Sequence, residues 1–339
     1  MKRVVLFIVL TMAIIGLVAA AGNQTQQQSE AENLGLGDNF PVAYVKDGTL
    51  YFFNPENEEK VQFTEETDTV FNCAYSDADA MFYYTVSRNG KLSLKQVDLS
   101  VTHLQPELLH DLRLRTGDFL SETFGEKAKL MCLENHVFLQ GGGCEDWKKG
   151  GGFYGFIDYS IKDNGYAITD NIPSLGGNPF YPGVDLVVDE SVFEQAENLD
   201  FSQYPFRYPS DGNKREFDFM DRGESGDGSK VLIALLTYTR VSSDVNSEAD
   251  EEPKLYIIAN SDGTMMKVLD HTNDRRLLSP LWSDNNLVYL RYRSSETGKE
   301  DGVSKQIAEL CYTRASDNMP KIIDCDVDYF AVRKQQTDW

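Results

Sequence analysis

Short apolar runs alternate with glycine-containing turns along much of the chain. Three examples are DGTLYFFN (47–54), RNGKLSLKQVD (88–98) and KLYIIANSDGT (254–264). In each, a turn pair that contains Gly stands beside a short stretch rich in Tyr, Phe, Leu, Ile or Val, which is the pattern of a β-hairpin. The sequence therefore predicts an all-β fold built from hairpins.

A larger unit repeats in the C-terminal third. SGDGSKVLIALLTYT (225–239) predicts a turn and a strand, and KLYIIANSDGTMMKVLD (254–270) adds a hairpin. SPLWSDNNLVYLRYR (279–293) begins the unit again, and residues 70–100 follow the same order. Each copy supplies four short strands over about 40 to 50 residues, which is the size of a β-propeller blade.

The two ends of the chain complement each other. VDYFAV (327–332) looks like the first strand of a blade, whereas VAYVKDGTLYFFN (42–54) and KVQFT (60–64) read as second, third and fourth strands. Joining them completes one blade and leaves no open edge. We therefore predict a six-bladed β-propeller with circular closure between the N- and C-terminal strands, its other blades spanning residues 70–110, 112–160, 161–210, 216–270 and 279–324.

The repeated turns carry a recognisable motif. Trp282, Ser283 and Asp284 precede an apolar strand, and Ser225, Asp227 and Gly228 occupy the same place one repeat earlier. With the hairpin LYIIANSDG (255–263), these turns resemble the repeats of TolB-like six-bladed propellers, whose blades carry a Trp-Ser-Pro-Asp-Gly turn. Asn285 stands where that motif has Gly, and Gly226 where it has Pro. The likeness is clear for three blades and poor between residues 103 and 215.

The resemblance implies an exported propeller-repeat protein, in a family that includes periplasmic scaffolds that bind proteins and propeller domains attached to peptidases. The motif residues themselves have structural roles. Asp and Ser cap the tight turn, Gly or Asn accepts a positive φ, and Trp or Tyr fills the space between blades.

The N-terminus has the features of a signal peptide. Lys2 and Arg3 precede an apolar run over residues 4–18, and the small residues Ala19-Ala20-Ala21 follow. We expect cleavage after residue 21, a polar tether over 22–39 and a single propeller domain over 40–339. The alternative is an uncleaved anchor, because the run is barely shorter than the roughly 20 residues of a spanning helix. The mature protein is expected to be periplasmic or secreted.

The net charge is −22, from 32 basic and 54 acidic residues. Such a surface repels phosphate backbones and anionic lipid head groups, which disfavours nucleic-acid binding and electrostatic docking on membranes. We expect a monomer without a cofactor or a bound metal, and a protein or peptide partner in the cell envelope.

Five cysteines leave at least one unpaired. Cys132 with Cys144, and Cys311 with Cys325, are close enough in sequence to pair, but spacing alone does not settle connectivity. Cys73 lies in an apolar run and is expected to be a buried thiol.

The blade pattern weakens between residues 103 and 215. PELLHDLRLR (106–115) and SVFEQAENLD (191–200) have helical composition, and LQGGGCEDWKKGGGFYGF (139–156) contains two triple-glycine runs. No phosphate-binding glycine motif is present, so we expect a loop there.

The same region is rich in aromatic residues set among prolines. Exposed Trp, Tyr and Arg on loops of a rigid scaffold are the usual anchors of interfaces. The alternative is that these side chains cover the core of irregular blades. The candidate binding residues are Trp147, Tyr154, Tyr181, Phe206, Arg207 and Tyr208.

Motifs for catalysis are weak. GESGDG (223–228) comes nearest to Gly-x-Ser-x-Gly but has Asp227 in place of the second Gly, and the four histidines form no metal-binding pattern. Asp221, Glu224 and Asp227 depart from EF-hand spacing, which favours a plain Asp-rich turn. We favour a non-catalytic scaffold that binds a protein or peptide. The alternative is a propeller-fold hydrolase that acts on a glycan through carboxylates near the axis, which the sequence does not identify.

Overall fold

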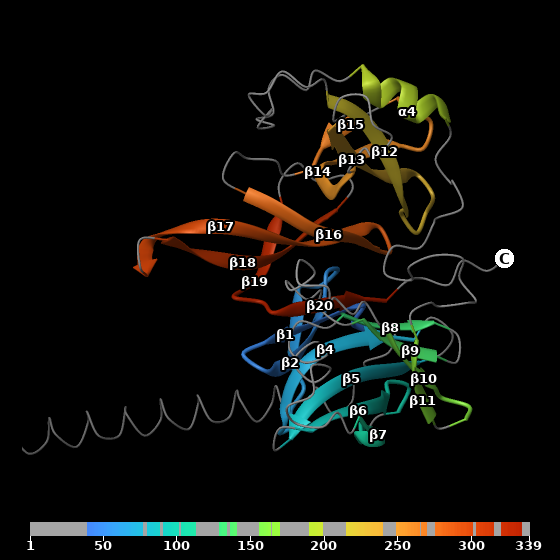
Figure 1. Ribbon diagram of the computed structural model, residues 1–339, viewed down its shortest axis with the longest axis vertical. Helices are drawn as coiled ribbons and strands as arrows, with labels where there is room; N and C mark the ends of the chain where they lie inside the picture. Colours follow the sequence, from blue (N-terminus) through green and yellow to red (C-terminus); the bar gives the residue numbers. More distant parts are fainter. Residues whose placement is uncertain are drawn as a thin grey trace, which may run out of the picture.

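The computed structural model describes residues 39–76, 80–88, 91–101, 103–112, 129–133, 136–140, 156–163, 165–169, 190–198, 215–239, 249–264, 266–269, 275–300, 303–314 and 320–333. These residues are mostly β and form several four-stranded antiparallel sheets (Figure 1). Among them, no helix is long and apolar enough to cross a membrane.

We name the sheets A to E in chain order. Sheet A contains β20 (Tyr329–Val332), β1 (Val42–Lys46), β2 (Thr49–Asn54) and β3 (Glu59–Gln62); sheet B contains β4 (Thr69–Tyr75), β5 (Met81–Arg88), β6 (Lys91–Asp98) and β7 (Glu107–Leu112); sheet C contains β8 (Lys129–Leu133), β9 (His136–Gln140), β10 (Phe156–Ser160) and β11 (Gly165–Thr169). Sheet D contains β12 (Arg215–Glu224), β13 (Lys230–Thr239), β14 (Ala249–Asn260) and β15 (Met266–Val268); sheet E contains β16 (Arg275–Ser283), β17 (Asn286–Glu300), β18 (Val303–Arg314) and β19 (Lys321–Cys325).

Sheets B to E are each a meander of consecutive strands. Their first strands lie near one another: β4 contacts β20 and β8, and β16 contacts β12 and β20. Meanders that meet along their first strands form a propeller-like arrangement.

Sheet A joins the two ends of the described chain. β20 pairs with β1 in antiparallel register, Val42 opposite Val332 and Val45 opposite Tyr329. The backbone N–H of Asp328 extends the contact by donating to the Val45 carbonyl at 2.9 Å. The expected pairing of the last strand with the first strands of the chain is thus observed.

The predicted hairpins are present. Asp47 and Gly48 join β1 to β2 with φ values of 50° and 71°, as a two-residue type I′ turn requires. Gly48 also packs closely, since a Cβ there would lie 2.7 Å from Thr69 Cγ2. Arg88 pairs with Lys91 in the hairpin of sheet B.

The middle of the chain departs from two of the three sequence-based expectations and agrees with the third. The boundary between residues 160 and 161 is wrong, because β10 and β11 on either side of it pair in one sheet. Residues 107–112, within the stretch of helical composition, form β7 instead of a helix, because β7 adds to the edge of β6 and this pairing overrides helical composition. Residues 191–200 do contain a helix, α4 (Glu190–Glu197).

The core lies between neighbouring sheets. Alternate residues of each strand face opposite ways, so Leu232 and Ala234 of β13 pack with sheet E, whereas Val231 and Ile233 pack with Val192 of α4. α4 therefore covers the face of sheet D that points away from sheet E. Similar clusters join sheet A to B, B to C and A to E; their largest buried members include Phe52, Phe82, Tyr84, Tyr83, Tyr44 and Phe53.

Candidate functional site

The six candidate binding residues lie outside the described residues: Trp147, Tyr154, Tyr181, Phe206, Arg207 and Tyr208. The two triple-glycine runs lie outside them as well.

The strand ends to which those segments attach are described. Gln140 at the end of β9 pairs with Phe156 at the start of β10, and Phe156 pairs with Thr169 at the end of β11. These three residues are neighbours across one end of sheet C. The segment 141–155 and the chain that leaves residue 169 therefore both attach at this end, which we call the C-sheet end.

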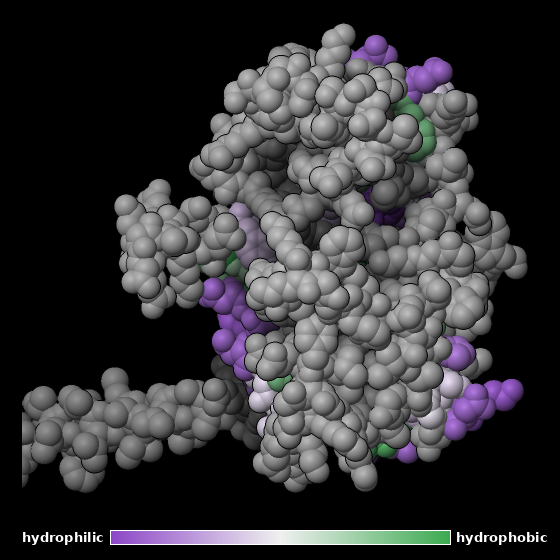
Figure 2. Space-filling model, in the orientation of Figure 1, coloured by the Kyte–Doolittle hydropathy of each residue, from purple (hydrophilic) through white to green (hydrophobic). Residues whose placement is uncertain are grey.

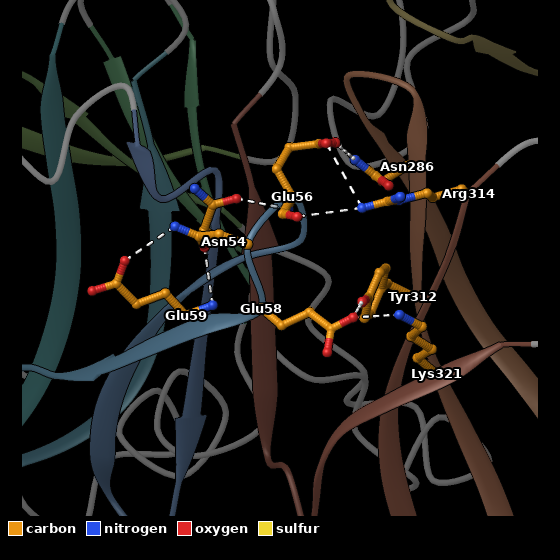
Figure 3. A network of polar contacts seen from close by, with 9 residues as sticks. Asn54, Glu56, Glu58, Glu59, Asn286, Tyr312, Arg314 and Lys321 are labelled. Atoms are coloured by element: carbon orange, nitrogen blue, oxygen red, sulfur yellow. Dashed lines mark hydrogen bonds and ion pairs between the residues drawn. The ribbon is translucent and has the colours of Figure 1, made fainter.

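An extended set of polar contacts lies between sheets A and E. We call this contact the A–E seam. In its first part, the β2–β3 turn (55–58) lies against β17 and β18 (Figure 3). Asn286 Nδ2 donates to Glu56 Oε1 at 3.1 Å, and Arg314 Nη2 lies 3.8 Å from Glu56 Oε2. The tip of one sheet is thereby held by two strands of the other.

Glu58 makes the second contact of this turn. Its carboxylate accepts hydrogen bonds from Lys321 Nζ and, at 3.0 Å, from the Tyr312 hydroxyl. The bonds from Lys321 and Tyr312 lower the pKa of the Glu58 carboxyl below its ordinary value. Glu58 and Lys321 are both about half exposed, so solvent screens this pair.

Asp324 on β19 is the hub of the other part of the seam. It accepts hydrogen bonds from Lys46 Nζ at 2.6 Å, Lys60 Nζ at 2.8 Å and the Tyr44 hydroxyl at 2.9 Å. Burial raises the pKa of Asp324, but these donors outweigh it and hold the pKa well below its usual range. Burial, and then the neighbouring Asp324 carboxylate, raise the pKa of Tyr44.

A second buried carboxylate lies between sheets A and B. Glu66 accepts hydrogen bonds from Lys95 Nζ at 2.5 Å, from the Tyr84 hydroxyl at 3.0 Å and from the Asp68 N–H at 2.9 Å. Burial raises the pKa of Glu66, but the hydrogen bonds from Lys95, Asp68 and Tyr84 lower it by more than burial raises it. The pKa of Glu66 is therefore below its ordinary value. Glu66 thus links the β3–β4 connection to two strands of sheet B.

A buried ion pair lies within sheet E. Arg291 and Glu309 are opposite each other on β17 and β18, and they are 5% and 1% exposed. Arg291 donates to Glu309 Oε2 from Nε at 2.8 Å and from Nη2 at 2.6 Å. Removing either partner would leave a buried charge, which is costly.

The repeated turns contact each other across sheets D and E. Gly226 N donates to the Asp284 carbonyl at 3.0 Å, and Asp227 N donates to Asn285 Oδ1 at 3.1 Å. Trp282 Nε1 donates to the Gly223 carbonyl at 3.1 Å. The motif therefore has the structural role expected of it, with one difference.

That difference concerns the residue with positive φ. In the β16–β17 turn it is Asp284, at 53°, whereas Asn285 uses its side chain to reach the neighbouring turn. Asp227 accepts from Ser225 Oγ at 2.8 Å and from Ser229 N at 2.9 Å, as in a plain Asp-rich turn.

Groups suited to a metal are not found among the described residues, since no three or more His, Cys, Asp or Glu side chains are arranged to hold one. The carboxylates detailed above have basic or hydroxyl partners from neighbouring strands. Glu56, Glu58 and Asp324 make contacts between sheets A and E, and Glu66 joins the β3–β4 connection to sheet B, whereas Glu309 is paired within sheet E.

The cysteines answer one open question. Cys73 is buried, as the apolar run around it predicted. Burial raises the pKa of its thiol. Cys311 and Cys325 are both thiols, with Ile322 and Glu309 as their respective partners across β18 and β19, so this possible disulfide is not formed. Cys144, the possible partner of Cys132, lies outside the described residues.

On the face shown in Figure 2, the described residues that reach the surface are mostly hydrophilic, and the hydrophobic ones appear as small separate spots. The large apolar side chains that are exposed in the described part are Val101, Leu108, Leu281 and Ile322.

Comparisons with known proteins identify no family. The chain matches no protein-family model and no curated protein. It is similar to a chain of a nidogen–laminin complex (7% identity, 86% of this chain and 98% of that chain covered, TM-score 0.39). It is also similar to TolB from Acinetobacter baumannii, with 12% identity, 83% of this chain and 51% of that chain covered, and a TM-score of 0.25. A protein from Lactobacillus plantarum is similar as well, with 9% identity, 85% of this chain and 98% of that chain covered, and a TM-score of 0.32. TM-scores below 0.5 do not establish a common fold, so these likenesses carry no weight for the fold or the function of this chain.

Proposed function

We propose that this chain is an exported, non-catalytic six-bladed β-propeller that binds a protein or peptide. Its binding face would contain Trp147, Tyr154 and Tyr181 from the segments that leave the C-sheet end, together with Phe206, Arg207 and Tyr208 from the segment between α4 and β12.

The ring in this proposal is supported by the strand pairing. β20 completes sheet A from the far end of the chain, and the first strands of neighbouring sheets contact one another. Such closure removes two open sheet edges. The sixth blade would be supplied by residues 170–214 between β11 and β12, the stretch that also contains α4.

One observation supports the binding face most strongly. Gln140, Phe156 and Thr169 are cross-strand neighbours, so the segment that carries Trp147 and Tyr154 and the chain that leads from residue 169 to Tyr181 attach to a common end of sheet C. Phe206, Arg207 and Tyr208 lie on the segment between α4 and β12, two elements of which one packs on sheet D and the other belongs to it. Long connections placed by a rigid scaffold are where binding residues usually occur. Residues far apart in sequence would thereby share one face.

The chemistry of the partner follows from charge and side-chain type. The chain carries a net charge of −22, and the candidate face combines aromatic rings with one arginine. A partner with an apolar centre and a basic rim would complement both features. Export through the signal peptide would mean that the chain binds this partner in the cell envelope or outside the cell.

Affinity capture tests the proposal. The tagged mature protein, incubated with native envelope extract, should retain a discrete partner, and the double variant Trp147→Ala/Tyr208→Ala should not. Leu108→Ala, which trims an exposed apolar side chain on the outer edge of sheet B, is the matched control and should capture as well as the unaltered protein. Hydrolysis of a glycan by the purified protein, without any captured partner, would overturn the proposal in favour of the enzyme.

A further inference from the structure

Two buried polar atoms lie together at the β16–β17 turn. Ser283 and Asn286 are directly opposite each other on the two strands, and they are 0% and 3% exposed. Neither Ser283 Oγ nor Asn286 Oδ1 has a hydrogen-bond partner among the described residues. The amide of Asn286 is oriented by its other end, since Nδ2 donates to Glu56 Oε1 at 3.1 Å.

The equivalent serine of sheet D is satisfied by protein groups. Ser225 Oγ donates to Asp227 Oδ1 at 2.8 Å and accepts from the Lys230 N–H at 3.0 Å. In sheet E the turn is shorter, and Asn285 directs its side chain to the N–H of Asp227. The side chain of Asn285 therefore bonds to the turn of sheet D, and the Ser283 hydroxyl has no bond within its own turn like the one that Ser225 makes to Asp227.

Leaving both atoms without partners would be costly. A buried hydroxyl or amide oxygen without a hydrogen bond loses its bonds to water and gains none in return, so such atoms are nearly always partnered in folded proteins. Enclosed water molecules commonly fill this role, bridging two or more buried polar groups.

We propose that a water molecule is enclosed at this position in the A–E seam and bridges Ser283 Oγ and Asn286 Oδ1. The two atoms define what the ligand must be. Asn286 Oδ1 can only accept, so the ligand must donate a hydrogen, and the Ser283 hydroxyl can donate to it or accept from it. Both atoms are closed off from solvent, so the ligand must also be very small. Water meets all three conditions.

The position gives this water a structural task. Asn286 links sheet E to Glu56 of sheet A through its Nδ2. A water on its Oδ1 would satisfy the other end of the same amide and hold it toward Glu56. The hydration site would therefore support the contact between the first and last described sheets.

A crystal structure of the unaltered protein at a resolution that shows ordered water tests the proposal. We expect a density peak about 2.7–3.2 Å from both atoms. The same crystals of Ser283→Ala should lose the peak, and Leu108→Ala, far from the turn, should keep it. A structure in which the two side chains bond each other directly, or in which no peak lies between them, would overturn the proposal. So would a peak that persists unchanged in Ser283→Ala. If Ser283→Ala does not fold, the unaltered protein alone decides.

Discussion

Lys60 Nζ on β3 lies 2.8 Å from Asp324 Oδ2 on β19, although the two residues are 264 positions apart in the chain. The same carboxylate binds Lys46 of β1 through its other oxygen at 2.6 Å. One side chain of sheet E therefore holds two strands of sheet A, and the seam between the first and last sheets depends on it.

Replacing this carboxylate should destabilise the protein. Asp324→Asn keeps the shape but removes the charge that binds two lysines and the Tyr44 hydroxyl. We expect the free energy of unfolding to fall by about 2–3 kcal/mol, the usual cost of losing charge-assisted hydrogen bonds at a partly buried site. Denaturant unfolding measures it. Asp326→Asn, an exposed neighbour, is the control and should change stability by less than about 0.5 kcal/mol. Equal effects of the two variants would show that the seam does not depend on Asp324.

The depressed carboxyl pKa values predict loss of stability in acid. The pKa values of Asp324 and Glu66 are both lowered by folding. Such groups bind fewer protons in the folded state, so their contribution is complete above the ordinary carboxyl pKa of about 4 and is lost as pH falls below it. The free energy of unfolding, measured between about pH 6 and 3, should fall more steeply for the unaltered protein than for Asp324→Asn or Glu66→Gln. Parallel curves would contradict the assignment.

Removing the last strand should open sheet A. Ending the chain after Asp324 deletes β20, including the buried Phe330, and exposes the edge of β1. We expect a loss of more than about 3 kcal/mol, which lowers the thermal midpoint by at least about 4 °C in a chain of 339 residues. Ending it after Arg333 keeps β20 and serves as the control. If both truncated proteins melt alike, the pairing of β20 with β1 does not stabilise the fold.

The contact between α4 and sheet D can be tested at one glycine. Gly263 has a φ of 72°, and a Cβ there would lie 2.5 Å from Gln195 Nε2 of α4. Gly228 has a similar φ of 65°, but its Cβ would meet nothing closer than 3.7 Å. Gly228→Ala and Gly263→Ala should each cost about 1–2 kcal/mol, the strain of the left-handed conformation, because the exposed end of the Gln195 side chain can move away from a new Cβ. Denaturant unfolding measures both costs. A larger cost at Gly263 that disappears in a Gln195→Ala background would show that this side chain is held against the turn.

Local patterns predicted the hairpins, because a turn such as Asp47-Gly48 is specified by the two residues that adopt positive φ. The link between the chain ends was also predictable, since a lone apolar strand and an incomplete blade complement each other. Asp324 was missed because its partners lie 264 to 280 positions away and leave no local signal. β7 was misread because pairing with β6 decides its conformation more strongly than composition does.

The affinity of the captured partner for single variants tests the binding face most directly. Trp147→Ala and Tyr208→Ala should each weaken binding by about 2 kcal/mol, or roughly 30-fold, while leaving the thermal midpoint nearly unchanged. Leu108→Ala should alter neither quantity. Unaltered affinity together with a large fall in the thermal midpoint would show that Trp147 and Tyr208 belong to the core, and would contradict the proposed function.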